Sequence, residues 1–177
     1  MIASKGLSED SYLGILKLVA CINFSSEDPQ PLMQTIFDLE VESEDSPIAI
    51  NISEGLMHLL NEVGYPHHES PEALSYLRMS CDLIAFPNSK PYFYLNDAKI
   101  LLDLIIRELG NVSDSCLELR EWYLSLLMAL INNPHYESIQ SYRTLDISGI
   151  LEHINLDSKA SCLHEKSSEI LTVLKQW

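Results

Sequence analysis

The segment from 91 to 136, PYFYLNDAKILLDLIIRELGNVSDSCLELREWYLSLLMALINNPHY, places the strongest constraint on what this chain can fold into. It contains two long stretches with helical patterning that are apolar on nearly every side, joined by a short turn. A helix that is apolar all round is buried against neighbours on several sides. Two such helices in succession indicate a multi-layered helical protein, in which the few polar residues of this segment stand out.

Helical patterning continues through the rest of the chain, with short connections and no convincing period-two alternation. In the first central helix, Asn96 is the expected N-cap and Gly110 the expected residue after the C-terminus, and Ser70 followed by Pro71 opens the helix before it. We expect about seven or eight helices, at residues 10–24, about 30–39, 48–63, 71–85, 97–109, about 113–133, 145–154 and 160–175.

The predicted fold class is therefore all-α, in a single domain over residues 1–177. Two architectures fit the pattern: an armadillo/HEAT-like helical stack and a compact helical bundle. No strict repeat period is visible, but several helices are apolar around most of their circumference, as helices with neighbours on both sides must be. We favour the stack. The first predicted helix, residues 10–24, also has enough apolar residues to be mostly buried.

The chain is strongly acidic, with a formal net charge of −15, of which residues 1–62 carry −9. Binding to a phosphate backbone needs clustered Lys and Arg, so the charge argues against nucleic acid as a partner. A basic protein surface would complement the acidic N-terminal third, although the charge also serves solubility alone.

No apolar stretch approaches the ~20 residues that cross a bilayer, and the N-terminus has no apolar core of a signal peptide. We expect a cytoplasmic protein without membrane insertion. The four cysteines are widely spaced and are expected to be small buried hydrophobic residues in a reducing compartment: Cys21, Cys81, Cys116 and Cys162.

Motifs for catalysis are missing from the sequence. It has no phosphate-binding or dinucleotide-binding glycine loop, no nucleophile elbow and no zinc-protease motif. The adjacent pair His67-His68 has no Cys or carboxylate at ligand spacing, which makes a poor zinc site. We therefore expect a protein that is not an enzyme, with no cofactor, no metal and no small-molecule substrate.

The first central helix carries one polar stripe, in which Lys99, Asp103 and Arg107 follow at intervals of four residues and Glu108 lies beside them. One interpretation is a ladder of i, i+4 ion pairs on the solvent side, each contributing ~0.2–0.5 kcal/mol. The other is a ridge of alternating charge on which a partner protein docks. Both remain open from the sequence.

Arg120 lies away from the polar stripe of its own helix, on an apolar face. A buried guanidinium needs a carboxylate or carbonyl acceptor, and Asp97, Asp103 and Glu108 on the preceding helix are the expected candidates. An acceptor on another protein is the alternative. Before that helix, the aromatic residues 92–94 either pack at the helix entry or anchor an interface through Tyr94.

The same segment resembles the signature of the WISH/DIP/SPIN family, which includes the yeast Dip and Ldb proteins. The resemblance rests on an aromatic-Tyr-x-Asn-Asp start, a Leu-Asp helix with a following arginine, an Arg-x-x-Tyr-Leu helix and a closing Pro-Tyr. The matching positions here are Phe93-Tyr94, Asn96-Asp97, Leu102-Asp103, Arg107, Arg120, Tyr123-Leu124 and Tyr136.

This resemblance implies an armadillo-like C-terminal region that binds the actin-related protein 2/3 complex and activates it without a preformed filament. The filaments produced would be linear seeds for branched networks, at cortical actin patches and in endocytosis. A generic helical-repeat adaptor for another cytosolic protein is the alternative function. The candidate protein-binding residues are Tyr94, Asp97, Lys99, Asp103, Arg107 and Arg120.

Overall fold

The computed structural model describes residues 9–42, 48–63, 70–86, 94–139 and 141–175, and the predicted all-α fold is confirmed in it. No strand occurs within these ranges. The helices, with two short 3-10 segments, are α1 (Glu9–Ser25), α2 (Gln30–Glu42), α3 (Ile48–Glu62), α4 (Pro71–Ala85), α5 (Leu95–Asn111), α6 (Leu117–Asn132), η1 (Pro134–Ile139), α7 (Thr144–Leu156), η2 (Ser158–Leu163) and α8 (His164–Leu174).

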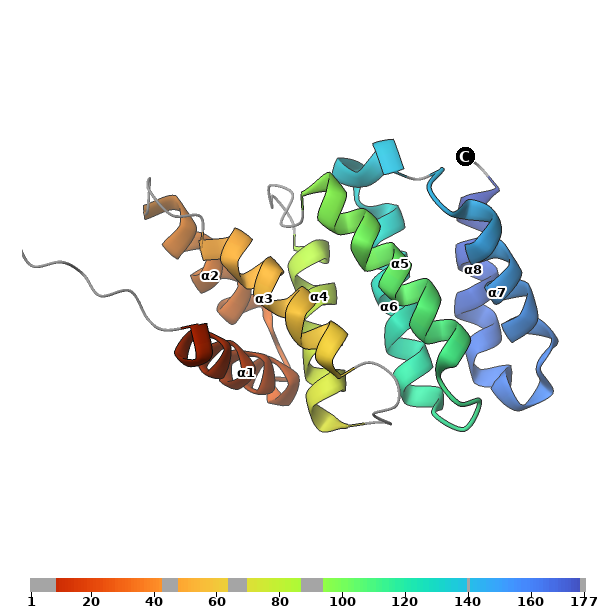
Figure 1. Ribbon diagram of the computed structural model, residues 1–177, viewed down its shortest axis with the longest axis horizontal. Helices are drawn as coiled ribbons and strands as arrows, with labels where there is room; N and C mark the ends of the chain where they lie inside the picture. Colours follow the sequence, from red (N-terminus) through yellow and green to blue (C-terminus); the bar gives the residue numbers. More distant parts are fainter. Residues whose placement is uncertain (1–8, 43–47, 64–69, 87–93, 140, 176–177) are drawn as a thin grey trace, which may run out of the picture.

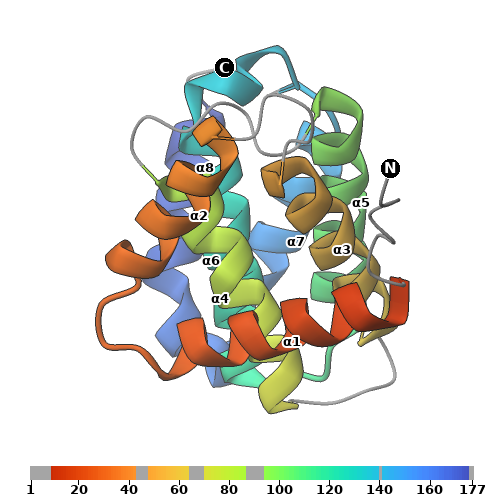
Figure 2. The same ribbon diagram turned by 90° about the vertical axis from the view of Figure 1, so that its left-hand side faces the viewer.

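The helices form two layers that run along the long axis of the molecule (Figure 1). One layer holds α3, α5 and α7, and the other holds α2, α4, α6 and α8, while α1 crosses the end of the stack (Figure 2). Each consecutive pair, from α3 and α4 to α7 and α8, contributes one helix to each layer and packs together. This arrangement is the armadillo/HEAT-like stack favoured by the sequence.

Helices α4 and α6 lie at the centre of the stack, where α4 packs against α1, α3 and α6, and α6 packs against α4, α5 and α8. On α4, Leu77 and Met79 point to nearly opposite sides of the helix, and both side chains are fully buried. On α6, Leu124 and Leu126 show the same pattern. A helix buried on opposite sides explains the nearly continuous apolar sequence of these segments.

The expectation that the first helix is mostly buried was wrong. In α1, Leu16 and Ala20 belong to the core, but Ile15, Leu18 and Ile22 are 48%, 60% and 52% exposed. The cause is the position of α1 at the end of the stack, where only one of its faces has described neighbours (Figure 2). Apolar periodicity alone does not show which helix of a stack is terminal.

Several predicted helix ends also differ from the structure. Ser70 caps α4 as expected, since its hydroxyl accepts a hydrogen bond from the amide of Ala73 at 3.1 Å. However, α5 begins at Leu95 with Tyr94 as its N-cap, so Asn96 lies inside the helix. Gly110 is inside as well, because α5 continues to Asn111 without a left-handed glycine.

The segment before α6 forms a turn, and α6 starts at Leu117, four residues later than expected. The last predicted helix is divided into η2 and α8, with a non-helical conformation at Ala160.

All four cysteines are free thiols, but only Cys81 and Cys116 are buried, whereas Cys21 and Cys162 are exposed. The prediction of buried cysteines therefore held for two of the four.

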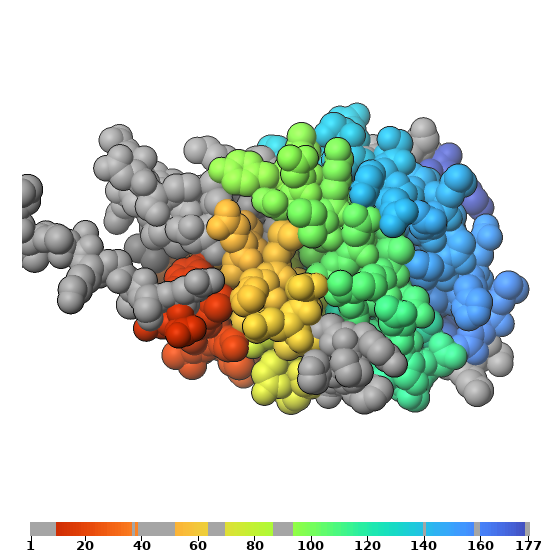
Figure 3. Space-filling view, in the orientation of Figure 1, coloured from red at the N-terminus to blue at the C-terminus, as the bar shows by residue number. Residues whose placement is uncertain are grey.

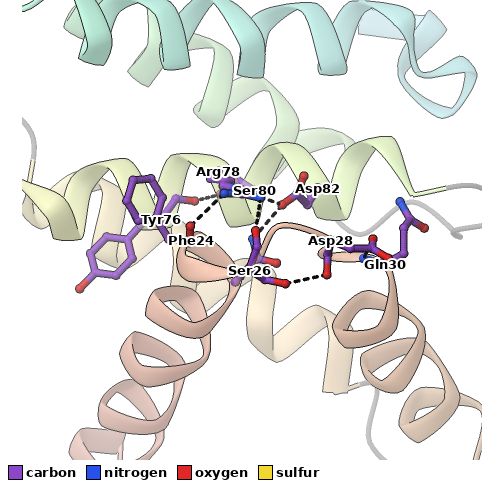
Figure 4. Close-up of polar contacts among 9 residues, drawn as sticks. Phe24, Ser26, Asp28, Gln30, Tyr76, Arg78, Ser80 and Asp82 are labelled. Carbon is purple, nitrogen blue, oxygen red and sulfur yellow. Dashed lines mark hydrogen bonds and ion pairs between the residues drawn. The ribbon is translucent and has the colours of Figure 1, made fainter.

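A polar junction joins the C-terminal end of α1 to α4 (Figure 4). Helix α1 has no basic residue in its last turn to bind its terminal carbonyls. Arg78 of α4 fulfils this role, because its guanidinium donates to the carbonyl of Phe24 at 2.9 Å and to that of Ser26 at 2.8 Å. Arg78 also pairs with Asp82 one turn later, and the Asn23 amide donates to the Asp82 carboxylate at 2.7 Å. One arginine thus caps a helix distant in sequence.

Candidate protein-binding surface

Helices α3, α5 and α7 lie side by side over one face of the molecule, with α5 between the other two (Figure 3). The polar stripe of α5 is on this face, but its charges bond to neighbouring elements. Asp103 accepts hydrogen bonds from the Tyr142 hydroxyl at 2.8 Å and from Nε of Arg143 at 3.0 Å. The Nζ atom of Lys99 lies over the Tyr142 ring, 5.8 Å from its centre. Asp103 therefore joins α5 to the start of α7 and does not pair along its own helix.

Arg143 has a backbone conformation that is unusual for a side chain other than glycine, with φ 59° and ψ 20°. This residue is the N-cap of α7, and no side chain caps the helix there. Left-handed backbone of this kind costs free energy and persists where surrounding contacts hold it. The guanidinium pairs with Asp103 at 3.0 Å and with Asp146, in the first turn of α7, at 3.1 Å. These contacts fix the charged group between two helices.

The same cluster changes the acidity of a tyrosine. The hydrogen bond from the Tyr142 hydroxyl to the Asp103 carboxylate raises the pKa of Tyr142, because the phenolate would lose this bond and meet a negative charge. Tyr142 is therefore a neutral hydrogen-bond donor near neutral pH. We call Lys99, Asp103, Tyr142, Arg143 and Asp146 the α5–α7 cluster.

Arg107 connects α5 to the other side, toward α3. Its two terminal nitrogens each lie 3.2 Å from the Asn61 side-chain oxygen, and its Nε donates to Glu108 at 2.7 Å. The Glu108 side chain is only 1% exposed, so the sequence interpretation that placed it beside a solvent stripe was incorrect. Burial, together with the nearby Glu108 charge, raises the pKa of Tyr123 on α6.

Arg120 is buried as the sequence suggested, with its side chain only 4% exposed. Its acceptor is different from the three expected ones. Nη1 donates at 2.9 Å to Asp114 in the turn before α6, and Asp97, Asp103 and Glu108 are not its partners. The Asp114 side chain is 59% exposed. The reason for the error is local: the turn from 113 to 116 replaces the helical start expected there and brings Asp114 next to Arg120.

Large apolar side chains are exposed around the α5–α7 cluster. At the start of α5, Tyr94 is 56% and Leu95 is 45% exposed, and five residues after Leu95, Ile100 is 54% exposed. On α7, Leu145 is 89% exposed. Tyr92 and Phe93, predicted with Tyr94 as an aromatic group, lie outside the described residues. Exposed apolar side chains beside ordered charges are typical of protein-binding surfaces.

The structure brings together only some of the predicted residues. Lys99 and Asp103 share a cluster, and Tyr94 and the half-buried Asp97 lie at the first turn of the same helix. Arg107 contacts α3, and Arg120 lies in a separate pocket near the other end of α5. Sequence reasoning missed Tyr142, Arg143 and Asp146. Tyr142 and Arg143 follow no helical period because they lie in a connection, so only their polar and aromatic character marked them.

A groove of about 670 Å³ lies in the other layer, between α4, α6 and α8. Its polar groups are largely engaged in structural contacts: Lys166 bonds to Glu121 and Ser125, and the Asn133 amide donates to the carbonyl of Ile84. Burial raises the pKa of the Cys81 thiol well above its usual range, which makes thiolate chemistry at neutral pH unfavourable. We therefore assign no catalytic role to this groove.

The residues that the structure describes contain neither a metal-binding group of side chains nor a membrane-spanning helix. No group of three or more His, Cys, Asp or Glu side chains there could hold a metal ion. The predicted pair His67-His68 lies outside those residues. Among the helices that the structure describes, none has the length and apolar character of a membrane span.

The stacked helix pairs and their leucine-rich core define an all-α protein with an armadillo/HEAT-like stack. A family model described as the SPIN90/Ldb17 leucine-rich domain matches residues 14–147, from within α1 to the first turn of α7. The chain belongs to this family, and the resemblance noted from residues 93–136 is confirmed.

Two curated relatives show how far the similarity extends. Protein dip1 of Schizosaccharomyces pombe is 27% identical over 168 residues, which are 94% of this chain and 41% of dip1. Protein LDB17 of Saccharomyces cerevisiae is 37% identical over 79 residues, which are 42% of this chain and 16% of that protein. The chain therefore spans less than half the length of these relatives. No solved structure matches it significantly.

Proposed function

We propose that this chain is a non-enzymatic module that binds the actin-related protein 2/3 complex and promotes nucleation of linear seed filaments without a preformed filament. The observation that carries the proposal is membership of the SPIN90/Ldb17 family, for which this activity is implied by the resemblance of residues 93–136. The place of action that follows is the cytoplasm, at cortical actin patches during endocytosis.

The mechanism that we propose is conformational. A stack without catalytic groups can change the activity of a partner only by binding one conformation of that partner more tightly than another. A preference of ~10⁴-fold moves an equilibrium from 1:99 to 99:1, and equal affinity for both conformations moves nothing. Rigidity of the binding surface supports such a preference, because a rigid surface does not adapt to the inactive arrangement.

The α3–α5–α7 layer is the binding face in this proposal. The α5–α7 cluster fixes the relative position of two helices through Asp103 and Arg143, and it holds charged groups in place before any partner arrives. Ile100 and Leu145 supply exposed apolar area beside these charges. A preordered surface loses less conformational entropy on binding than a flexible one.

The decisive experiment is an actin assembly assay with a pyrene reporter, the purified complex and this chain, without added filaments or another nucleation-promoting factor. A shortened lag that depends on both the chain and the complex is expected. An unchanged lag, in the presence of binding measured separately, would refute activation and leave a binding module. The absence of both activities would favour an adaptor for a different protein.

A pair of variants on α7 tests the binding face. Leu145 and Leu156 are nearly equally exposed, at 89% and 86%, but lie at opposite ends of this helix. Leu145→Glu is expected to weaken binding of the complex ~10-fold or more. A loss of this size is typical when an energetically important interface residue is replaced. Leu156→Glu is the matched control and should bind like the unmodified chain. Equal affinities of the two variants would exclude the α5–α7 cluster from the interface.

A further inference from the structure

A second pocket lies away from the α5–α7 cluster, at the C-terminal end of α5. Its volume is about 570 Å³, and it lies between the last turn of α5, the turn before α6 and one face of α7. The Arg120 side chain forms part of its wall, together with Ser113, Asp114 and His153. Every residue lining this pocket is among those that the structure describes.

The guanidinium of Arg120 has bonding capacity left over. Asp114 accepts one hydrogen bond, from Nη1, although a guanidinium offers five N–H donors. The Nε atom is buried and has no acceptor, in a residue that is 3% exposed. A buried N–H group without an acceptor costs free energy, and a second oxygen ligand would remove that cost. The Arg120 guanidinium therefore retains donors that the described residues do not use.

The wall of the pocket formed by α7 leaves free space in front of it. Gly149 lines it, and a Cβ atom at Gly149 would have no heavy atom within 4 Å. Gly110, on the wall formed by α5, has the same free space. The two glycines leave room for a side chain from another molecule to reach the arginine.

We infer that this pocket binds a carboxylate side chain of the protein partner, held by Arg120 through the donors that Asp114 leaves unused. A guanidinium binds a carboxylate through two parallel N–H donors, and such bonds are strong where water is excluded. The Asp114 charge disfavours a second anion beside it, and it does so more for a doubly charged phosphate than for a singly charged carboxylate. This repulsion is why we assign a carboxylate.

The assignment deepens the proposed function, because it names the chemistry of one contact with the partner. It can nevertheless be tested on the chain alone. The protein has four arginines, so its Nε–H signals in a nitrogen-15 NMR spectrum are few and can be assigned through single Arg→Lys variants of the other three. Titration at constant ionic strength would use sodium acetate as the carboxylate probe and inorganic phosphate as the competing oxyanion.

Acetate is expected to shift the Arg120 Nε–H signal saturably, and phosphate is expected to shift it less at equal concentration. Gly149→Leu should diminish the acetate shift, because the leucine side chain extends from the pocket wall into space that the glycine leaves free. Gly14→Leu is the control, since Gly14 also has free space around it but lies in α1. No shift with acetate, or an undiminished shift in Gly149→Leu, would overturn the proposed site. A larger response to phosphate would overturn the assignment to a carboxylate.

A final comparison uses the partner. If the carboxylate belongs to the bound complex, Gly149→Leu should weaken binding of that complex relative to Gly14→Leu. Acetate binding without any effect of Gly149→Leu on the complex would overturn the assignment to the partner. These results are distinguishable from failure of the proposed function, because the acetate titration does not depend on actin assembly.

Discussion

Replacing Arg78 by methionine is the most informative test of how the stack is held together. Methionine keeps most of the apolar stem of the arginine but removes the guanidinium that caps α1 from α4 (Figure 4). Two carbonyl groups, those of Phe24 and Ser26, lose their donors. Asp82 loses an ion pair whose atoms are 3.7 Å apart.

The size of the effect follows from these contacts. A hydrogen bond to a charged group contributes about 1.5–3 kcal/mol. Phe24 and Ser26 are only partly buried, so water can replace part of the lost bonding, and the lower end of that range applies. The partly exposed pair with Asp82 adds roughly 0–1 kcal/mol. The expected loss is ~3–4 kcal/mol, a large part of the ~5–15 kcal/mol by which folded domains are usually stable.

Urea unfolding followed by circular dichroism would measure the loss. With a slope of ~2–3 kcal/mol per M, the midpoint of Arg78→Met should fall by ~1–2 M. Arg78→Lys is the control: it keeps the charge but lacks the planar fork that bonds two acceptors, so an intermediate midpoint is expected. Hydrogen exchange should show earlier opening of α1 than of α6. A midpoint within measurement error of the unmodified chain, with α1 amides still protected, would refute this reasoning.

Three further comparisons, made with five substitutions, test individual charges. Arg107→Glu should destabilise the fold, because it places a second carboxylate beside the buried Glu108. Lys99→Glu should leave the urea midpoint nearly unchanged. Equal urea midpoints of the two variants would contradict this expectation. Burial raises the pKa of Asp82, so ionisation of this carboxyl group lowers the stability of the fold as the pH rises through that pKa. Asp82→Asn should therefore be more stable than the unmodified chain at neutral pH, and the difference should shrink on acidification. Urea midpoints measured at several pH values would show this. Arg120→Ala should lower the melting temperature and Arg120→Met much less, because methionine fills the space of the stem without a buried charge; identical melting of both would exclude a packing role.

The helical class and the stacked arrangement could be predicted from the sequence, because the buried faces of a helix carry apolar residues at a helical period. Helix α6 is the clearest case, since its continuous apolar sequence corresponds to a position between α4, α5 and α8. The same apolar pattern gave a wrong prediction of burial for α1. Ile15, Leu18 and Ile22 have the spacing of core residues but lie on the exposed face of the helix at the end of the stack. Periodicity reports which faces are apolar, and it does not report whether a neighbour covers them.

The polar contacts of the site could be predicted only in part. The sequence identified Lys99, Asp103 and Arg107 as a stripe and Arg120 as an arginine in need of an acceptor. It did not identify the acceptors, because each depends on how a connection folds. Asp103 bonds to Arg143, which is forty residues away in the sequence. The Arg143 backbone adopts a left-handed conformation, which the sequence does not indicate because the residue is not glycine.

All four arginines of the chain bond to a different secondary-structure element or connection. Arg78 joins α4 to the end of α1, Arg107 joins α5 to α3, Arg120 joins α6 to the turn before it, and Arg143 joins the connection before α7 to α5. These contacts employ four of the eleven Lys and Arg residues in a chain whose net charge is −15. The chain as a whole therefore attracts basic surfaces at long range and repels acidic ones.

The proposed Arg120 pocket binds an anion, although the chain as a whole repels anions. This difference indicates at which stage of binding the contact acts. A partner carboxylate approaching the chain is repelled by the net charge until it is within reach of the guanidinium. Such a contact contributes little to the rate of encounter, which depends on long-range charge, and it contributes mainly after docking, when water has been excluded. It would therefore select the register of the bound partner. Added salt should slow association with a basic partner surface, while Gly149→Leu should act mainly by increasing the dissociation rate.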